Sequence, residues 1–357
     1  MRRQILLCPG PVNTTSEVRR ALLRQDLCHR EPEFSVLLQR VRRNLLKGFG
    51  VASTHTVGIL SGSGTAALEA AVIASTRPGR ALLVVDNGVY GARMAQIAKV
   101  HGIRVIRLTC PILQRPALAR IEAALRRHTA VDAVGIVHHE TSTGLLNPVD
   151  EVARAARRRG QLVLVDAISS LGAEPLNLRT IDLCVGSAGK CLHAYPGLSF
   201  VLVSKRARAR MKAVPMRSLY LDLRTLLDAQ DAGPPPFTPA VQLIQGLDAA
   251  LEAFLREGLK TRITEYQRRA VFLRSGFARI GLTPLLPAAL QCHTLTALRL
   301  PPGLSYERLH DLLKRDGFVI YAGQSRLRRE IFRIAHMGAL TFADMRRLLR
   351  SLERWCG

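Results

Sequence analysis

Two charged side chains in the middle of the sequence follow apolar runs that have the length of buried strands. Asp166 ends the run 161–166, and Lys190 follows the run 182–186. In open α/β sheets, ligands lie beyond the carboxyl ends of the strands. Lysine can lose its proton and form an imine, which arginine does not do at ordinary pH. A strand-end aspartate either caps the next turn or pairs with a cation. The two residues therefore predict either local structural roles or one site with an amine and a carboxylate.

A group of small residues upstream adds a third element, Gly62-Ser63-Gly64-Thr65, between an apolar run and a helical pattern. The exposed N–H groups and the dipole of a helix start bind phosphate, and two hydroxyls add donors. The alternative is a capped helix behind a tight glycine turn. Together, a phosphate cradle, a carboxylate and a lysine at one sheet edge meet the needs of pyridoxal 5′-phosphate, whose phosphate, ring nitrogen and aldehyde each require a protein group.

Alternating elements must position these residues. From about residue 57 to 205, short β-rich apolar runs alternate with amphipathic stretches, which is typical of βαβ units in a sheet covered on both faces. Strands are expected at 57–60, 81–86, 104–108, 133–138, 161–166, 182–186 and 199–203. Helices are expected between them at 65–76, 90–100, 117–127 and 148–159.

The C-terminal part has a different pattern. Two long helical patterns, 239–256 and 259–280, precede a strand at 295–300, a helix at 305–315, strands at 318–321 and 331–335, and a helix at 341–355. This order suits a small α+β domain. The 357 residues favour two domains. We predict an α/β fold with a mostly parallel sheet, divided into an N-terminal segment (1–20), a large domain (21–258) and a small domain (259–357) reached through a bridging helix.

The composition limits the classes of partner that the chain is expected to bind. The chain has 52 Lys and Arg against 27 Asp and Glu, a net charge of +25, but the arginines are dispersed and aromatic residues make up 5%. A solvated basic surface is expected, with no nucleic-acid partner. The seven cysteines form no CxxC pair, so neither a metal site nor a disulfide framework is predicted. The same pattern predicts a cytoplasmic location. No run reaches membrane-spanning length.

A family resemblance rests on several strings: LCPGP at 7–11, NGVYGARM at 87–94, HETSTGLLNP at 139–148, VDAISS at 165–170, PGLSF at 196–200, GFVIY at 317–321 and FRI at 332–334. Through them the chain resembles the class V, fold-type I, pyridoxal-phosphate aminotransferases over nearly its whole length. The resemblance implies an enzyme with an amine and a 2-oxo acid as substrates. It also implies a homodimer with active sites at the interface.

Carried over residue by residue, the resemblance makes Lys190 the lysine that holds the cofactor as a Schiff base and Asp166 the partner of its ring nitrogen. Arg333 would bind the acidic group of the substrate. The other implied cofactor contacts are Gly62, Ser63, Gly64 and Thr65 with the phosphate, Tyr90 stacked on the ring, Ser142 or Thr143 with the ring hydroxyl, and Thr238 with the neighbouring subunit's phosphate. Relatives commonly have an amide side chain before the lysine, where this chain has Gly189.

Several substrate assignments follow from the resemblance. The strings resemble most the branch that moves an amino group from 2-aminoethylphosphonate to pyruvate, whereas segment 28–34 is equally similar to the alanine/serine:glyoxylate branch. A lyase or desulfurase of the same fold would need a reactive cysteine, and nothing around Cys292 indicates one. A regulator that binds nucleic acid is a further alternative prompted by the charge, but no fused DNA-binding module is visible.

Overall fold

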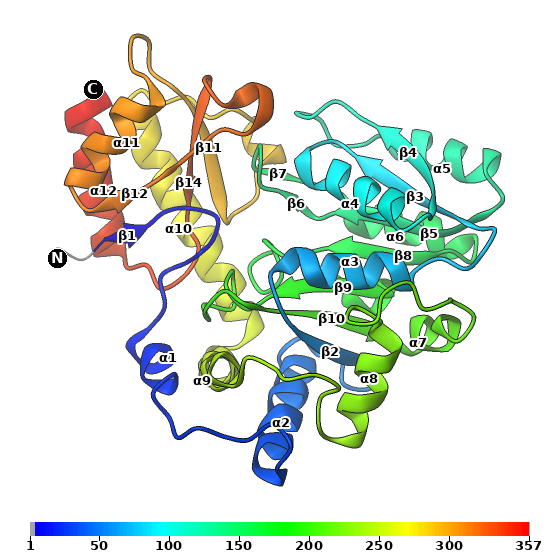
Figure 1. The fold of residues 1–357 in the computed structure, drawn as a ribbon. Helices are drawn as coiled ribbons and strands as arrows, with labels where there is room; N and C mark the ends of the chain where they lie inside the picture. Colours follow the sequence, from blue (N-terminus) through cyan, green and yellow to red (C-terminus); the bar gives the residue numbers. More distant parts are fainter. Residues whose placement is uncertain (1–3, 357) are drawn as a thin grey trace.

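The computed structural model describes residues 4–356, and a seven-stranded sheet forms the centre of the large domain (Figure 1). The strand order is β2-β10-β9-β8-β5-β3-β4, and every neighbouring pair is parallel except those that β10 makes with β2 and β9. The strands are β2 (His55–Ser61), β3 (Ala81–Asp86), β4 (Arg104–Thr109), β5 (Val131–Val137), β8 (Leu162–Asp166), β9 (Leu183–Ser187) and β10 (Leu198–Ser204). This confirms the predicted α/β class and its mostly parallel sheet.

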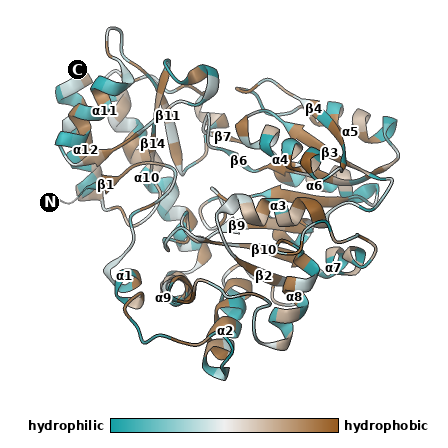
Figure 2. Cartoon of the chain, viewed as in Figure 1, coloured by the Kyte–Doolittle hydropathy of each residue, from teal (hydrophilic) through white to brown (hydrophobic). Residues whose placement is uncertain are grey.

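Alternate residues of each strand enter two cores, one on each face of the sheet. On β3, Leu82 and Val84 join the core under helices α3 (Gly64–Ala74) and α4 (Val89–Val100). Leu83 and Val85 join the opposite core with α5 (Leu118–Arg127) and α6 (Val149–Arg158). Because both faces are covered, the strands read as continuous apolar runs, and Figure 2 shows the sheet as the most hydrophobic layer.

The remaining helices of the large domain lie around the end of the sheet formed by β2. One of them, α9 (Val241–Glu257), was expected, and the expected helix α10 (Leu259–Arg279) follows it into the small domain. Four others were not among the predicted elements: α1 (Ser16–Ala21), α2 (Pro32–Gly48), α7 (Lys205–Met211) and α8 (Leu223–Ala232). Three short 3₁₀ turns occupy Leu178–Thr180, Ala288–Leu290 and Ser325–Leu327.

The small domain is a three-stranded antiparallel sheet with helices packed on it. Its strand order is β11-β14-β13, from β11 (Leu295–Arg299), β14 (Ile331–Ala335) and β13 (Tyr321–Ala322), and its helices are α10, α11 (Tyr306–Arg315) and α12 (Phe342–Cys356). The strand expected at 318–321 is two strands in two sheets. The buried Ile320 separates β12 (Phe318–Val319), which pairs in parallel with β1 (Ile5–Leu6), from β13, which pairs with β14.

A short hairpin, β6 (His139–Glu140) with β7 (Leu145–Leu146), connects the sheet edge with the small domain. The carboxyl ends of the parallel strands face that domain, which lies at the upper left in Figure 1. Within residues 4–356, no helix combines the length and the apolar character needed to cross a bilayer. In the same part of the chain, no cluster of three or more His, Cys, Asp or Glu side chains could hold a metal ion.

Candidate active site

A cavity of about 170 Å³ lies where the carboxyl ends of β8 and β9 meet the start of α3. It brings together six of the residues expected from sequence, namely Ser63, Gly64, Thr65, Tyr90, Asp166 and Lys190. Its other lining residues are Leu68, Arg93, His139, Ile168 and Ser169. The cavity forms because parallel strands end at one edge, so residues far apart in sequence face a common space.

Asp166 is the buried carboxyl group of this cavity, with 4% of its surface exposed. Its Oδ1 accepts a hydrogen bond from Ile168 N at 3.0 Å, and within residues 4–356 it forms no ion pair. Burial raises the pKa of Asp166 to about 6, although the Ile168 N–H and the charges of Arg93 and Lys190 act in the opposite direction. At neutral pH the site therefore holds a carboxylate that a ligand cation would stabilise.

Lys190 lies in the turn after β9, under the N-terminal segment. Its Nζ donates a hydrogen bond to Pro9 O. Gly10 crosses the lysine with φ +125°, and a Cβ there would lie 2.2 Å from Lys190 Nζ. Burial lowers the pKa of Lys190, and the nearby thiols of Cys191 and Cys8 oppose this shift. A lysine with a lowered pKa is more often neutral near pH 8, which imine chemistry requires.

The start of α3 provides a cradle for an anion. Ser63 is its N-cap residue and makes no capping hydrogen bond through its side chain. Ala66 N donates to Ser63 O at 2.9 Å, so the N–H groups of Gly64 and Thr65 are the ones that remain available in the first turn. Gly64 packs against Ile168, where a Cβ would lie 2.7 Å from Cδ1. Gly62 has a different part in the cradle: its N–H donates to Gly197 O at 2.7 Å, and its φ of +155° turns the chain.

Two cavity residues with ionisable side chains, Arg93 and His139, were missed by the sequence analysis. Arg93 donates to Thr65 Oγ1 at 3.3 Å and lies over the ring of Tyr90, 4.9 Å from its centroid. His139 is buried, with Nδ1 3.0 Å from Thr294 Oγ1 and Nε2 2.9 Å from Cys292 Sγ. Both belong to the strings that carry the resemblance, but only their long-range contacts reveal their place in the site.

The hydroxyls of Ser142 and Thr143 bond to the hairpin itself. Ser142 Oγ donates to the carboxylate of Glu140 at 2.5 Å, and Thr143 Oγ1 donates to Glu140 O at 3.3 Å. Neither residue is among those that line the cavity. Glu140 is fully buried, and its Oε2 accepts from Tyr90 N at 3.1 Å. The carboxylate thus anchors Tyr90, which lines the cavity, and the role expected of the two hydroxyls stays a prediction.

Arg333 lies at the middle of β14 and is 2% exposed. Its Nε donates to Ala322 O at 2.8 Å and its Nη1 to Thr141 O at 2.9 Å, so the small domain and the hairpin together fix the guanidinium. Burial lowers the pKa of Arg333, yet arginine stays protonated at any working pH. It is a rigid cation, and its charge contributes to the lowered pKa of Lys190.

Thr238 is not brought to the cavity of its own chain. It lies in the loop between α8 and α9, 3.4 Å from His29 Nε2, in a groove shared with Ser61 and Tyr220. Gly189 fits its surroundings for a steric reason. A Cβ there would lie 2.7 Å from Pro196 Cα, so the backbone of the returning loop occupies the space that a side chain would need.

Comparison with known proteins decides the family. The model of the family described as aminotransferase class-V matches residues 15–339. The chain belongs to the class V aminotransferases. As a member, it is an enzyme of a family that is in general dependent on pyridoxal phosphate.

Named relatives of this class V aminotransferase cover nearly its full length. It is 35% identical to the 2-aminoethylphosphonate–pyruvate transaminase of Aeromonas hydrophila, over 99% of this chain and 95% of that protein. The corresponding transaminase of Vibrio cholerae is 34% identical, over 98% and 96%. Among solved structures, the alanine–glyoxylate aminotransferase of a Nostoc species has a TM-score of 0.94 at 27% identity, covering 99% of this chain and 95% of that one.

The only cysteine proposed for a desulfurase reaction does not suit that chemistry. Cys292 is fully buried beside His139, and burial raises its pKa to about 12. A nucleophilic thiol requires a lowered pKa and access to its substrate. In this aminotransferase Cys292 instead supports the wall of the cavity through its contact with His139.

The residues of the cavity fit pyridoxal phosphate. The uncapped start of α3 suits the phosphate, the unpaired carboxylate of Asp166 suits a protonated ring nitrogen, and Lys190 suits the aldehyde. Arg93 holds Thr65 beside the phosphate cradle. The cavity therefore provides a protein group for the phosphate, the ring nitrogen and the aldehyde of this cofactor.

Proposed function

We propose that this chain is a pyridoxal-phosphate aminotransferase that moves an amino group from 2-aminoethylphosphonate to pyruvate, giving phosphonoacetaldehyde and alanine. The observation that carries the proposal is the near-full-length identity of 33–35% to relatives named for this reaction. The cavity supports it, since a lysine, a buried carboxylate and a phosphate cradle converge there.

Each residue has a definite part in the proposed mechanism. Pyridoxal phosphate, when bound, supplies a conjugated ring that makes the C–H bond beside the substrate amino group acidic. Asp166 pairs with the ring nitrogen and keeps it protonated. Lys190 Nζ, whose pKa is lowered by burial, would act as the general base that accepts the proton of that C–H bond and as the general acid that donates it again. Arg333 binds the phosphonate or carboxylate through two charged hydrogen bonds.

A second donor class has one specific observation in its favour. The alanine–glyoxylate aminotransferase of the Nostoc species has a TM-score of 0.94. Both substrate classes carry an anionic group that Arg333 would bind, so the guanidinium alone does not distinguish a phosphonate from a carboxylate. Identity favours the phosphonate branch, because the relatives named for it are 33–35% identical, against 27% for the glyoxylate enzyme.

The test is a half-reaction followed by visible absorbance. The purified holoenzyme is mixed with 2-aminoethylphosphonate, and we expect the cofactor band to shift to that of the amine form. Alanine and serine are the matched donors, and Lys190→Ala is the control that cannot form the linkage. A band that responds to alanine or serine but ignores the phosphonate would transfer the assignment to the glyoxylate branch. The absence of a Lys190-dependent band would contradict the cofactor itself.

We further propose a homodimer in which Thr238 reaches the phosphate of the neighbouring chain. Thr238 lies outside the cavity of its own chain, in a groove that it shares with the exposed Tyr220. Leu219, the neighbour of Tyr220 in the sequence, is exposed as well. Exposed apolar side chains beside a groove are typical of interfaces.

A cytoplasmic location accords with seven free cysteines, three of which, Cys184, Cys191 and Cys292, are fully buried.

A further inference from the structure

Basic side chains that are dispersed in the sequence gather on the side of the sheet where the parallel strands begin, opposite the active site. Helices α3, α4, α5 and α6 end there, and the strands that follow them begin there. Helix α7 joins the same edge, because the last residue of β10, Ser204, pairs with the first residue of β2, His55. In Figure 1, α5 and α7 lie at the right of the sheet, far from the small domain. We call this surface the basic edge.

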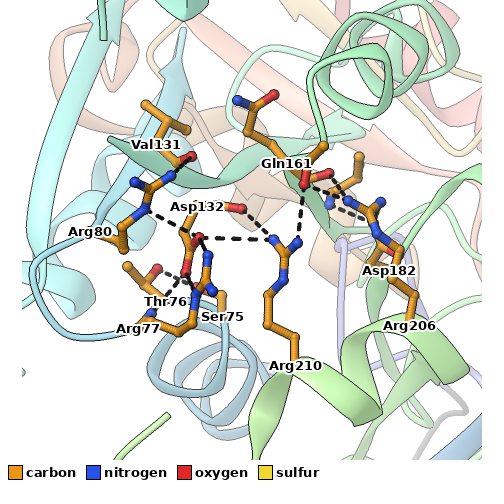
Figure 3. A network of polar contacts seen from close by, with 12 residues as sticks. Ser75, Thr76, Arg77, Arg80, Val131, Asp132, Gln161, Asp182, Arg206 and Arg210 are labelled. Atoms are coloured by element: carbon orange, nitrogen blue, oxygen red, sulfur yellow. Dashed lines mark hydrogen bonds and ion pairs between the residues drawn. The ribbon is translucent and has the colours of Figure 1, made fainter. Parts of the chain in front are cut away.

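Two buried carboxylates anchor arginines along the middle of the basic edge (Figure 3). Asp132 is 1% exposed and forms ion pairs with Arg77 at 2.6 Å, Arg80 at 3.5 Å and Arg210 at 3.9 Å. Asp182 is fully buried and pairs with two further arginines, Arg157 and Arg206, each at 3.3 Å. Five guanidiniums thus surround two carboxylates, which leaves a surplus of three positive charges.

Exposed basic residues extend this surplus. Within residues 4–356, the following exposed side chains of the basic edge form neither an ion pair nor a side-chain hydrogen bond: Lys99, Arg104, Arg126, Arg127, Arg159, Lys205 and Lys212. Cations at helix ends of this kind are partly explained by the helix dipole, which favours them at C-termini. That explanation fails for α7, whose first turn carries Lys205 and Arg206 at an N-terminus, where the dipole disfavours them.

The spread of the charges indicates a long ligand. From β10 to β4 the sheet has five strand spacings, which at ~4.8 Å each gives a track of about 24 Å. A single phosphate would contact only part of it, whereas a B-form duplex presents phosphates at regular intervals over such a length. Single-stranded nucleic acid is bound by stacking on aromatic rings. The exposed tyrosines of the described chain, Tyr220 and Tyr321, lie elsewhere: Tyr220 donates to Ser61 O at the carboxyl end of β2, and Tyr321 is in the small domain.

The sequence, in which these basic residues are dispersed, predicted no nucleic-acid partner. Because the fold gathers them on one surface, we propose instead that the basic edge binds duplex DNA through its phosphate backbone, without reading its sequence, on the side of the molecule away from the active site. Arginine suits this contact because its fork of donors matches phosphate oxygens. The two buried carboxylates hold the central guanidiniums in place and so reduce the flexibility that phosphate binding would otherwise have to restrict.

The test is fluorescence anisotropy of the full-length holoenzyme with a labelled 24-base-pair duplex of random sequence, between 25 and 200 mM salt. Binding is expected to weaken steeply with salt, since each neutralised phosphate contributes a slope of about −0.9 in log K against log salt. The variant R126Q/R127Q/R159Q/K212Q removes four unpaired charges of the basic edge. We expect at least a tenfold loss of affinity at 100 mM salt and a slope smaller by about 2 to 4.

The matched control is R308Q/R315Q/R346Q/R350Q, which removes four exposed charges from α11 and α12 of the small domain. It should bind the duplex as the wild type does, and both variants should keep the wild-type transaminase rate. Equal losses in the two variants would overturn the proposal, because they would report net charge alone. No binding at 25 mM salt, or tighter binding of a single strand, would also overturn it. So would binding to phosphatidylserine vesicles without any binding to the duplex.

Discussion

Asp166 carries a cost for the folded protein that its function explains. Its carboxyl group is removed from water, and burial raises its pKa from 3.8 to about 6. The folded chain therefore binds a proton more tightly than the unfolded chain between these pH values. As the pH rises from 4 to 6, the unfolded state loses its proton first, so the free energy of unfolding falls. A ligand cation at this position would remove the cost.

We therefore expect Asp166→Asn to stabilise the cofactor-free protein while abolishing activity. The shift of about two pKa units corresponds to ~3 kcal/mol above pH 6, and the difference from wild type should vanish near pH 4. Urea unfolding of both proteins at pH 7.5 and pH 4 measures it. Glu353→Gln, on an exposed residue, is the control and should show no such difference. A less stable Asp166→Asn protein at pH 7.5 would contradict the assignment.

Arg333 acts through the geometry of its guanidinium group, whose paired N–H donors lie in one plane. Two of its nitrogens are already bonded to the carbonyls of Ala322 and Thr141, which orients the rest of the guanidinium. Arg333→Lys keeps the positive charge but loses the paired N–H donors. We expect kcat/KM for the amino donor to fall about 100-fold, mainly through KM, because lysine cannot form paired charged hydrogen bonds. The cofactor spectrum should be unchanged. Steady-state kinetics beside Arg326→Lys, an exposed arginine, provide the comparison.

At the scale of elements, the N-terminal segment is part of the active site. It leaves β1, crosses Lys190 at Gly10 and makes an isolated bridge from Asn13 to Gly338 of the small domain. The close approach of Gly10 to Lys190 leaves no room for a side chain. The lysine is therefore covered by a segment more than 170 residues away in the sequence, since Pro9 and Lys190 are 181 residues apart.

Gly10→Ala is expected to reduce activity more than 100-fold and to remove the lysine-linked absorbance, because the new Cβ would lie 2.2 Å from Nζ and force the end of Lys190 to move. Circular dichroism should report an intact fold. The matched control is Gly233→Ala, whose φ of +136° is close to that of Gly10 and whose Cβ would meet no atom nearer than Ser35 Oγ at 3.7 Å. The control isolates backbone strain from the clash. If both variants lose activity equally, the clash has no specific role.

How far the sequence predicts this molecule differs between its elements. The buried strands were predicted well, because burial on both faces makes their pattern local: β3 and β14 have the expected bounds. Helices α7 and α8 were missed, since short segments packed on one side give a weak pattern. Lys190 and Asp166 were selected as candidates from strand ends, and both line the cavity. The contacts of Arg93 with Thr65 and of His139 with Cys292 were not, because they depend on the packing of distant segments.

At the scale of the whole molecule, the proposed dimer makes each active site depend on two chains. Thr238→Ala and Lys190→Ala should each inactivate the enzyme, the first through lost phosphate binding and the second through the lost amine. Mixed after joint unfolding and refolding, they should recover about a quarter of wild-type activity. Half of the dimers would be hybrids, and each hybrid has one intact site. Light scattering checks the dimer, and a monomeric active enzyme would contradict the arrangement.

The pairing of β1 with β12 has a consequence for the order in which the chain can fold during synthesis. Ile5 and Phe318 are register partners, so the first strand leaves the ribosome more than 300 residues before its partner exists. Ile5 and Leu7 belong to the core of the small domain. Until residue 318 has been synthesised, this apolar segment has no partner, and the cover of the lysine cannot close. The candidate cavity therefore forms later than its own strands, which are made early.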